Sequence, residues 1–374
     1  MLRSITTGLG LMLTLFAKSA LATTIALPPF FSENMVLPSD CRFILKGKAE
    51  PLDNVDLYLN NQLFRGVANS DGQWQIEINP LSSIKNIRME IKSANAGTKS
   101  INQVSAGEVW LCGGQSNMVV PVSYASDGGN DAFSDSDDIR FYINGKWIKV
   151  DKNNYKNMQA VPYFLARERS RLTGKVIGII VAAQGGTGIE AWMPQDAMPD
   201  SKTGEKMRAL ASVPEVIEAA KLDGSEKMRP YGQHRLAKWG LGRAYPSELY
   251  QKYVLPIAGI PVNGIVWYQG ESNAYMPMAQ EYDLWLKGLV SSWRKLFSDV
   301  PFMIVELPKY AENPQCRDAL RSSQKKFVDS SANTYYIPAY DLGDDQNIHP
   351  VRKRAMGKRI AEFIQSRNIK NEKN

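Results

Sequence analysis

The sequence predicts an α/β domain built on a parallel sheet, preceded by a small all-β domain. Short strand candidates separated by turn residues fill the first part of the chain, and continuous apolar strands alternate with amphipathic helices in the rest. Strands that are apolar on both faces are typical of a parallel sheet covered on both sides. Strands that alternate with helices predict a layered α/β domain. The composition, 44% apolar and 22% charged, is that of a globular protein.

The N-terminus has the features of a secretory signal. Arg3 is followed by an apolar run at residues 9–17, and the segment ends in Ala20-Leu21-Ala22. A basic start, a short apolar core and an A-x-A ending describe a cleavable signal peptide. We therefore expect a signal peptide at residues 1–22 and a secreted or periplasmic protein. No later run of about 18 apolar residues predicts a membrane span.

Residues 23–105 are expected to form a small β-sandwich domain. The strand candidates lie at 57–59, 62–67, 74–78 and 88–92. Turn residues such as Ser70-Asp71-Gly72 separate them. Several short strands at close spacing are typical of a sandwich.

Residues 106–374 are expected to form the α/β domain. The continuous apolar strands lie at 109–112, 176–182, 265–268, 302–305 and 334–337. Apolar residues recur at intervals of three and four over 282–296 and 356–364, which predicts two helices. Segments 120–155 and 195–245 are polar and poor in strand signals, so we interpret them as long insertions near the site.

Charge and cysteine content exclude two classes of function. The formal net charge is +7, and much of the excess is a basic run at residues 352–374. Such a run on a terminal helix is typical of a solvated face, so we expect no nucleic-acid binding. The spacing of Cys41, Cys112 and Cys316 suggests no zinc site. We expect Cys112, inside an apolar strand, to be a buried free thiol.

Polar and glycine-rich segments follow four of the predicted strands. They are Gly113–Met118, Gln184–Thr187, Gln269–Asn273 and the loop that runs from Asp341 to His349. In an open α/β sheet the ligand lies beyond the carboxyl ends of the strands. We therefore expect the four segments to meet at one rim and form the site.

Ser116 and His349 are the candidate nucleophile and base. A serine hydroxyl is a weak nucleophile unless a neighbouring base takes its proton. The chain has only two histidines. His349 follows a strand-end loop, whereas His234 lies in a polar insertion, so His349 is favoured.

The same rim offers candidates for the remaining catalytic roles. The backbone N–H groups of Ser116 and of Gly185 or Gly186, together with the Gln269 amide, could stabilise an oxyanion. The acid that orients the imidazole could come from either of two segments. The sequence spacing does not choose among Glu271, Asp341, Asp344 and Asp345.

The motifs together resemble the sialate O-acetylesterase family of the SGNH hydrolases. The segments that carry the resemblance are Gly114–Met118, Gly185–Trp192, Trp267–Ala274, Asp341–Asp344, Ile348–Pro350 and the opening Leu27–Leu37. The resemblance implies a three-layer α/β/α hydrolase domain that removes acetyl groups from O-acetylated sugars without a metal or cofactor. It also implies that Ser116 is the nucleophile, His349 the base and Glu271 the triad acid, with Gly185, Gly186 and Gln269 at the oxyanion hole.

The sequence departs from the pattern at the triad acid. Many SGNH enzymes have an acid three residues before the histidine, where this chain has Gln346. This favours Glu271, a loop aspartate that reaches round, or a working Ser–His pair.

A non-catalytic carbohydrate-binding protein on the same scaffold is the alternative function. A lipase or peptidase is disfavoured because the run Gly114–Met118 lacks the second glycine of a Gly-x-Ser-x-Gly elbow.

Overall fold

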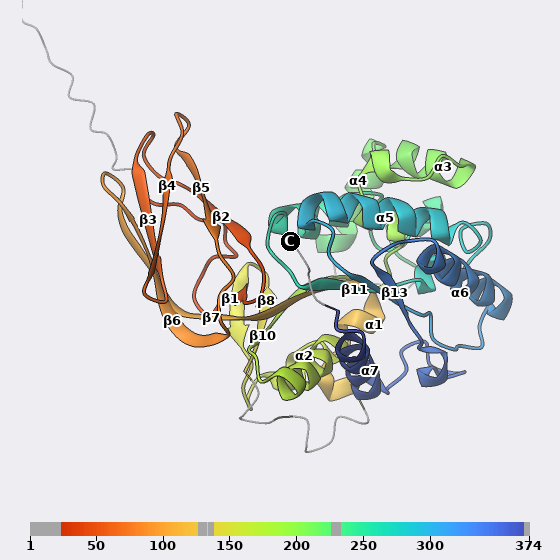
Figure 1. Cartoon of the computed structure of the whole chain (residues 1–374). Coiled ribbons are helices and arrows are strands. Elements are labelled where there is room, and N and C mark those ends of the chain that lie inside the picture. The colour runs from red at the N-terminus through yellow and green to blue at the C-terminus, as the bar shows by residue number, and fades with distance from the viewer. Residues whose placement is uncertain (1–23, 126–132, 134–137, 226–232, 370–374) are drawn as a thin grey trace, which may run out of the picture.

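The computed structural model describes residues 24–125, 133, 138–225 and 233–369 (Figure 1). The predicted signal peptide lies outside these residues. Among the helices of the described part, none has the length and apolar character that crossing a membrane requires.

Each strand and helix that the sequence predicts is present in the structure, together with others. The strands are β1 (Val36–Pro38), β2 (Phe43–Lys48), β3 (Asn54–Leu59), β4 (Gln62–Val67), β5 (Gln73–Ile78), β6 (Ile84–Ser93), β7 (Gly97–Gly114), β8 (Ile139–Ile143), β9 (Lys146–Lys149), β10 (Ile177–Ala183), β11 (Gly264–Tyr268), β12 (Phe302–Val305) and β13 (Thr334–Ile337). The helices are α1 (Ser116–Val119), α2 (Ala160–Thr173), α3 (Lys202–Leu210), α4 (Pro214–Ser225), α5 (Tyr282–Phe297), α6 (Pro314–Asp329) and α7 (Lys353–Ser366).

The predicted layered α/β architecture is confirmed. The main sheet has the strand order β13-β12-β11-β7-β10-β8-β9. Its pairs are parallel except for β9, which runs antiparallel to β8. Helices α5 and α6 pack with one face of this sheet, and α2 and α7 pack with the other (Figure 1). The result is a sheet between two helical layers, with an N-terminal β-domain beside it.

The prediction that residues 120–155 are only a polar insertion is wrong, because β8 and β9 form there. Arg140 conceals the strand signal, since a charged residue is not expected in a buried strand. Its side chain is fully buried, and it donates to the Gln103 carbonyl and to Asn86 Oδ1 at 2.7 Å. The turn Asn144-Gly145 between β8 and β9 is a strong hairpin signal. In segment 195–245 the described residues contain helices α3 and α4 and no strand.

Strand β7 belongs to both parts of the molecule. Its first half pairs with β6 of the β-domain, and its second half pairs with β10 and β11 of the main sheet. The predicted domain boundary after residue 105 therefore falls inside a single continuous strand of 18 residues.

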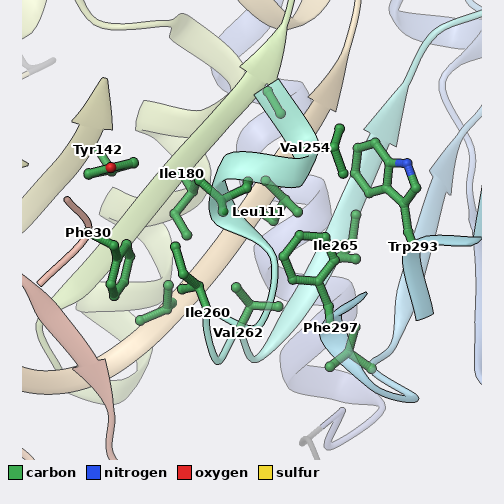
Figure 2. Packing of buried hydrophobic residues seen from close by; sticks show 14 of the residues in the cluster. Phe30, Leu111, Tyr142, Ile180, Val254, Ile260, Val262, Ile265, Trp293 and Phe297 are labelled. Carbon is green, nitrogen blue, oxygen red and sulfur yellow. The ribbon is translucent and has the colours of Figure 1, made fainter. Parts of the chain in front are cut away.

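One apolar cluster also runs through both parts. Phe30 of the β-domain belongs to the same cluster as Leu111 and Ile180 of the main sheet and Trp293 of α5 (Figure 2). The Phe30 ring contacts Trp147 edge-on, with ring centroids 5.1 Å apart. The continuous strand and the shared core both oppose independent motion of the β-domain.

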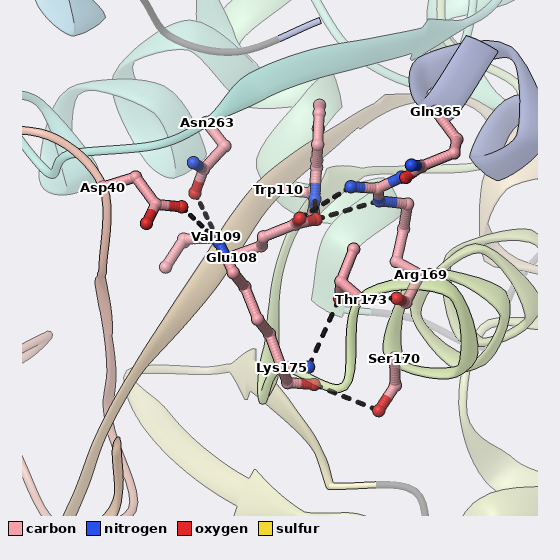
Figure 3. A network of polar contacts seen from close by, with 10 residues as sticks. All are labelled: Asp40, Glu108, Val109, Trp110, Arg169, Ser170, Thr173, Lys175, Asn263 and Gln365. Carbon is pink, nitrogen blue, oxygen red and sulfur yellow. Dashed lines mark hydrogen bonds and ion pairs between the residues drawn. The ribbon is translucent and has the colours of Figure 1, made fainter. Parts of the chain in front are cut away.

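A buried ion pair fixes the middle of β7 to the helical layer. Glu108 accepts from Arg169 of α2 at 2.6 and 2.9 Å and from the Trp110 indole at 2.9 Å (Figure 3). Arg169 also donates to Gln365 of α7 at 2.8 Å. Breaking one partner of such a pair leaves a buried charge without compensation.

We expect Arg169→Met to lower the free energy of unfolding by about 3 kcal/mol, because it leaves Glu108 buried and unpaired. Urea denaturation followed by tryptophan fluorescence measures this loss. Arg171→Met is the matched control, since Arg171 lies on the same helix in an exposed pair with Glu168. That control should lose no more than about 0.5 kcal/mol. Equal losses in the two variants would contradict the assigned role of Arg169.

Candidate active site

Ser116 lies directly beyond the carboxyl end of β7. Gly114 has φ of +142°, and an added Cβ would come within 2.1 Å of the Tyr268 carbonyl oxygen. Only glycine lets the two backbones approach so closely there. The next N–H, that of Gln115, donates to the same carbonyl at 3.1 Å. This contact ends the strand and places Ser116 at the first residue of α1, where it is half-buried.

Gly185 lies next to Ser116, as predicted for two neighbouring strand ends. An added Cβ on Gly185 would lie 3.4 Å from the Ser116 Cβ. Within the described part of the chain, the backbone N–H groups of Ser116 and Gly185 have no hydrogen-bond acceptor. Gly186 has φ of +73°, and its Cα faces the Arg243 side chain. Two adjacent backbone donors beside one hydroxyl form an arrangement that can hold an oxyanion.

Gln269 does not have the contacts expected of an oxyanion donor. Its side chain is fully buried, and its amide N–H2 faces three acceptors: Gln115 Oε1 at 2.9 Å, the Thr187 carbonyl at 3.0 Å and Asn273 Oδ1 at 2.7 Å. Its carbonyl accepts from the Tyr282 hydroxyl. An amide has only two N–H donors, so none remains for a ligand. Gln269 instead links the segments that follow β7, β10 and β11.

Asn117 brings the histidine loop to the nucleophile. Its amide nitrogen donates to the Ile348 carbonyl at 3.0 Å and to a carboxylate oxygen of Glu271. Ile348 directly precedes His349, and Asn117 directly follows Ser116. The candidate nucleophile therefore directly precedes Asn117, the candidate acid contacts it, and the candidate base follows a residue that contacts it.

Glu271 is the candidate acid whose charge acts on His349. Its second carboxylate oxygen, Oε2, is buried and has no hydrogen-bond partner among the described residues. Its negative charge raises the pKa of His349, which places the two groups within electrostatic range of each other. A buried carboxylate oxygen without a donor is costly unless a donor reaches it. An imidazole N–H is a donor of the kind that this oxygen lacks.

The three loop aspartates are engaged elsewhere. Asp341 forms a two-pronged ion pair with Arg359 at 2.6 and 2.7 Å, and this pair lowers the pKa of Asp341. Asp345 pairs with Lys309 at 2.6 Å. Asp344 accepts from the backbone N–H groups of the two residues that follow Asp345. All three are exposed and shape the loop, so Glu271 remains the best-placed acid.

The half-buried imidazole of His349 has a lowered pKa. Burial is the main cause, and the nearby Lys353 ammonium adds to it, while Glu271 opposes both. The loop that carries the histidine is also fixed by Tyr124, whose hydroxyl donates to the His349 carbonyl at 2.9 Å and accepts from Asn347 at 2.9 Å. A lowered pKa keeps the imidazole neutral and able to accept a proton near neutral pH.

Comparison with known proteins shows what this chain is similar to. Residues 231–366 match the family described as carbohydrate esterase, sialic acid-specific acetylesterase. The sialate O-acetylesterase of Rattus norvegicus is 23% identical over 316 residues, which cover 70% of this chain and 57% of that protein. The human enzyme is 25% identical over 308 residues, covering 70% and 54%. A crystal structure of a carbohydrate acetylesterase from Xanthomonas citri superposes with a TM-score of 0.74 at 25% identity, covering 94% of this chain and 76% of that one.

This chain is similar to the sialate O-acetylesterases over part of its length. The predicted resemblance to that family is confirmed, and so is the fold class. The chain spans little more than half the length of the two curated relatives. The matched range 231–366 contains Glu271 and His349, whereas Ser116 and Gly185 precede it.

Sequence reasoning missed two residues of the candidate site, Asn117 and Lys353. Asn117 lies inside the Gly114–Met118 motif but was assigned no role of its own. Lys353 was counted in the basic run at 352–374, yet it is only 1% exposed. Its position three and seven residues before Met356 and Ile360 puts it on the buried face of α7, which is the signal that could have revealed it.

Other predicted features can be placed directly. Cys41, Cys112 and Cys316 form no disulfide with one another, and burial raises the pKa of the Cys112 thiol, as expected for a thiol inside the sheet. Among the described residues, no three His, Cys, Asp or Glu side chains cluster in a way that could hold a metal ion.

Proposed function

We propose that this chain is a serine carbohydrate esterase that removes O-acetyl groups from acetylated sugars, such as sialic acid or related glycans. The observation that carries the proposal is the juxtaposition at the end of β7. Asn117, the residue after Ser116, contacts both Glu271 and the loop of His349, while Gly185 lies against Ser116. The relationship to the sialate O-acetylesterases supports an acetylated carbohydrate as the substrate.

The proposed reaction has two steps. His349 takes the proton of the Ser116 hydroxyl, whose oxygen attacks the acetyl carbonyl. The backbone N–H groups of Ser116 and Gly185 stabilise the oxyanion, with Gly186 completing the turn. His349 then gives the proton to the sugar oxygen, which leaves as a hydroxyl. A water molecule, deprotonated by His349, releases acetate from the acetyl-enzyme and restores Ser116.

Glu271 is the proposed triad acid. Its buried Oε2 would accept the imidazole N–H, fix the tautomer and stabilise the imidazolium that forms during each step. Gln269, predicted to donate to the oxyanion, is assigned a supporting role because its amide is already engaged.

We expect Ser116→Ala to lower acetate release by about a thousandfold or more, because no nucleophile remains. The assay measures acetate released from p-nitrophenyl acetate and from a panel of O-acetylated glycans. Ser123→Ala, at an exposed serine in the turn before Tyr124, is the control and should retain wild-type turnover. Release at near the wild-type rate by Ser116→Ala would refute the nucleophile. Glycan binding without any hydrolysis by the wild type would favour the non-catalytic alternative.

We expect Glu271→Gln to lower kcat by tenfold or more and to move the acid limb of the rate profile to lower pH. Activity requires neutral His349, so it rises with pH through the imidazole pKa. Because Glu271 raises this pKa, its removal lowers the pKa further below its ordinary value of about 6.5. The pH dependence of kcat/KM measures the shift. The acid limb should stay in place in the three loop variants, Asp341→Asn, Asp344→Asn and Asp345→Asn. A larger shift in one of them than in Glu271→Gln would assign the role of triad acid to that aspartate.

A further inference from the structure

A buried lysine lies beneath the candidate active site. Lys353 begins helix α7 and is 1% exposed. Its ammonium donates to Asn117 Oδ1 and lies 5.7 Å from the centre of the Tyr268 ring. Burying a lysine ammonium is costly unless polar groups face it, and the Asn117 carbonyl oxygen is one such group.

The lysine determines which way the Asn117 amide faces. An ammonium group can only donate, so the atom of Asn117 that faces it must be the carbonyl oxygen. The amide nitrogen then points to the other side, where it meets two acceptors, a Glu271 carboxylate oxygen and the Ile348 carbonyl. The lysine and the two acceptors therefore specify the same orientation, because a flipped amide would present its oxygen to both acceptors and its N–H2 group to the ammonium.

The charged groups around His349 come from three elements. Glu271 faces it from the turn Glu271–Asn273, Lys353 from α7, and the Tyr124 hydroxyl holds its backbone carbonyl. Arg317 of α6 acts on the far side, where it is within electrostatic range of Glu271. Asp341, Asp344 and Asp345 are engaged by other partners, as described above.

We propose that Lys353 and Asn117 are positioning residues for the reaction, with Lys353 fixing the Asn117 amide so that it holds Glu271 and the His349 loop beside Ser116. This inference rests on the proposed function. Neither residue touches the reacting atoms, so both would act through Glu271 and His349. A displacement of about 1 Å in such an arrangement is enough to cost roughly a hundredfold in rate.

The test compares Lys353→Met with Lys353→Arg and with Lys358→Met, an exposed position on the same helix. The readouts are kcat and KM for p-nitrophenyl acetate, the melting temperature, and the pKa of the His349 imidazole by NMR titration. The chain has only two histidines, and His234→Gln assigns their signals.

Lys353→Met should lower kcat by about tenfold to a hundredfold with little change in KM. It should also raise the pKa of His349, because a nearby positive charge is removed. Lys353→Arg should keep the pKa near that of the wild type and recover part of the rate, and Lys358→Met should match the wild type. A folded Lys353→Met protein with unchanged kcat and unchanged His349 pKa would overturn the proposal.

If Lys353→Met does not fold, Asn117→Asp carries the test. It keeps an acceptor for Lys353 but removes the donor to Glu271 and Ile348, so kcat should fall and the pKa of His349 should rise. A folded Asn117→Asp protein that matches the wild type in both would equally overturn the proposal. The NMR titration needs no turnover. A wild type that releases no acetate but shows the expected shift in Lys353→Met would therefore refute the esterase assignment, while the shift would still place the Lys353 charge beside His349.

Discussion

The central constraint in this molecule is the continuity of strand β7. Its residues pair with the β-domain at one end and with β10 and β11 at the other, so a single backbone sets the position of both parts. The strand ends where Gly114 passes the Tyr268 carbonyl, and Ser116 follows immediately. The Glu108–Arg169 ion pair fixes the middle of the strand to the helical layer. Ser116 is thus attached to the most extensively paired strand of the structure.

A second constraint acts at the rim, where buried amides join segments that are distant in the sequence. Gln269 connects the residues before Ser116, the turn after β10 and the turn after β11. Asn117 connects Glu271 to the loop of His349. Side-chain amides suit this role because each offers both donors and an acceptor. Buried and fully bonded, they hold the candidate catalytic groups without taking part in proton transfer themselves.

The sequence was sufficient to predict the strands of the main sheet other than β8 and β9, and to name Ser116 and His349 as candidates at their carboxyl ends. Apolar runs mark buried strands reliably, and parallel strands bring their carboxyl ends to one edge. What it could not resolve depends on compensation across the fold. Arg140 conceals strand β8 because its buried charge is paired with Asp138 and hydrogen-bonded to Asn86 of the β-domain. Lys353 resembles a solvated lysine in the sequence because its contact with Asn117 exists only in the folded chain. The choice of Glu271 over the loop aspartates likewise needed the partners of each carboxylate, which spacing along the chain does not contain.

The most direct test of the account is active-site labelling with a p-nitrophenyl phosphonate, followed by peptide mass spectrometry. We expect one labelled residue, Ser116, since a phosphonate reacts with an activated serine and mimics the tetrahedral intermediate. We also expect His349→Ala to slow the labelling strongly, because the hydroxyl then lacks its base. A label on another serine, or acetate release by a protein in which Ser116 stays unlabelled, would contradict it.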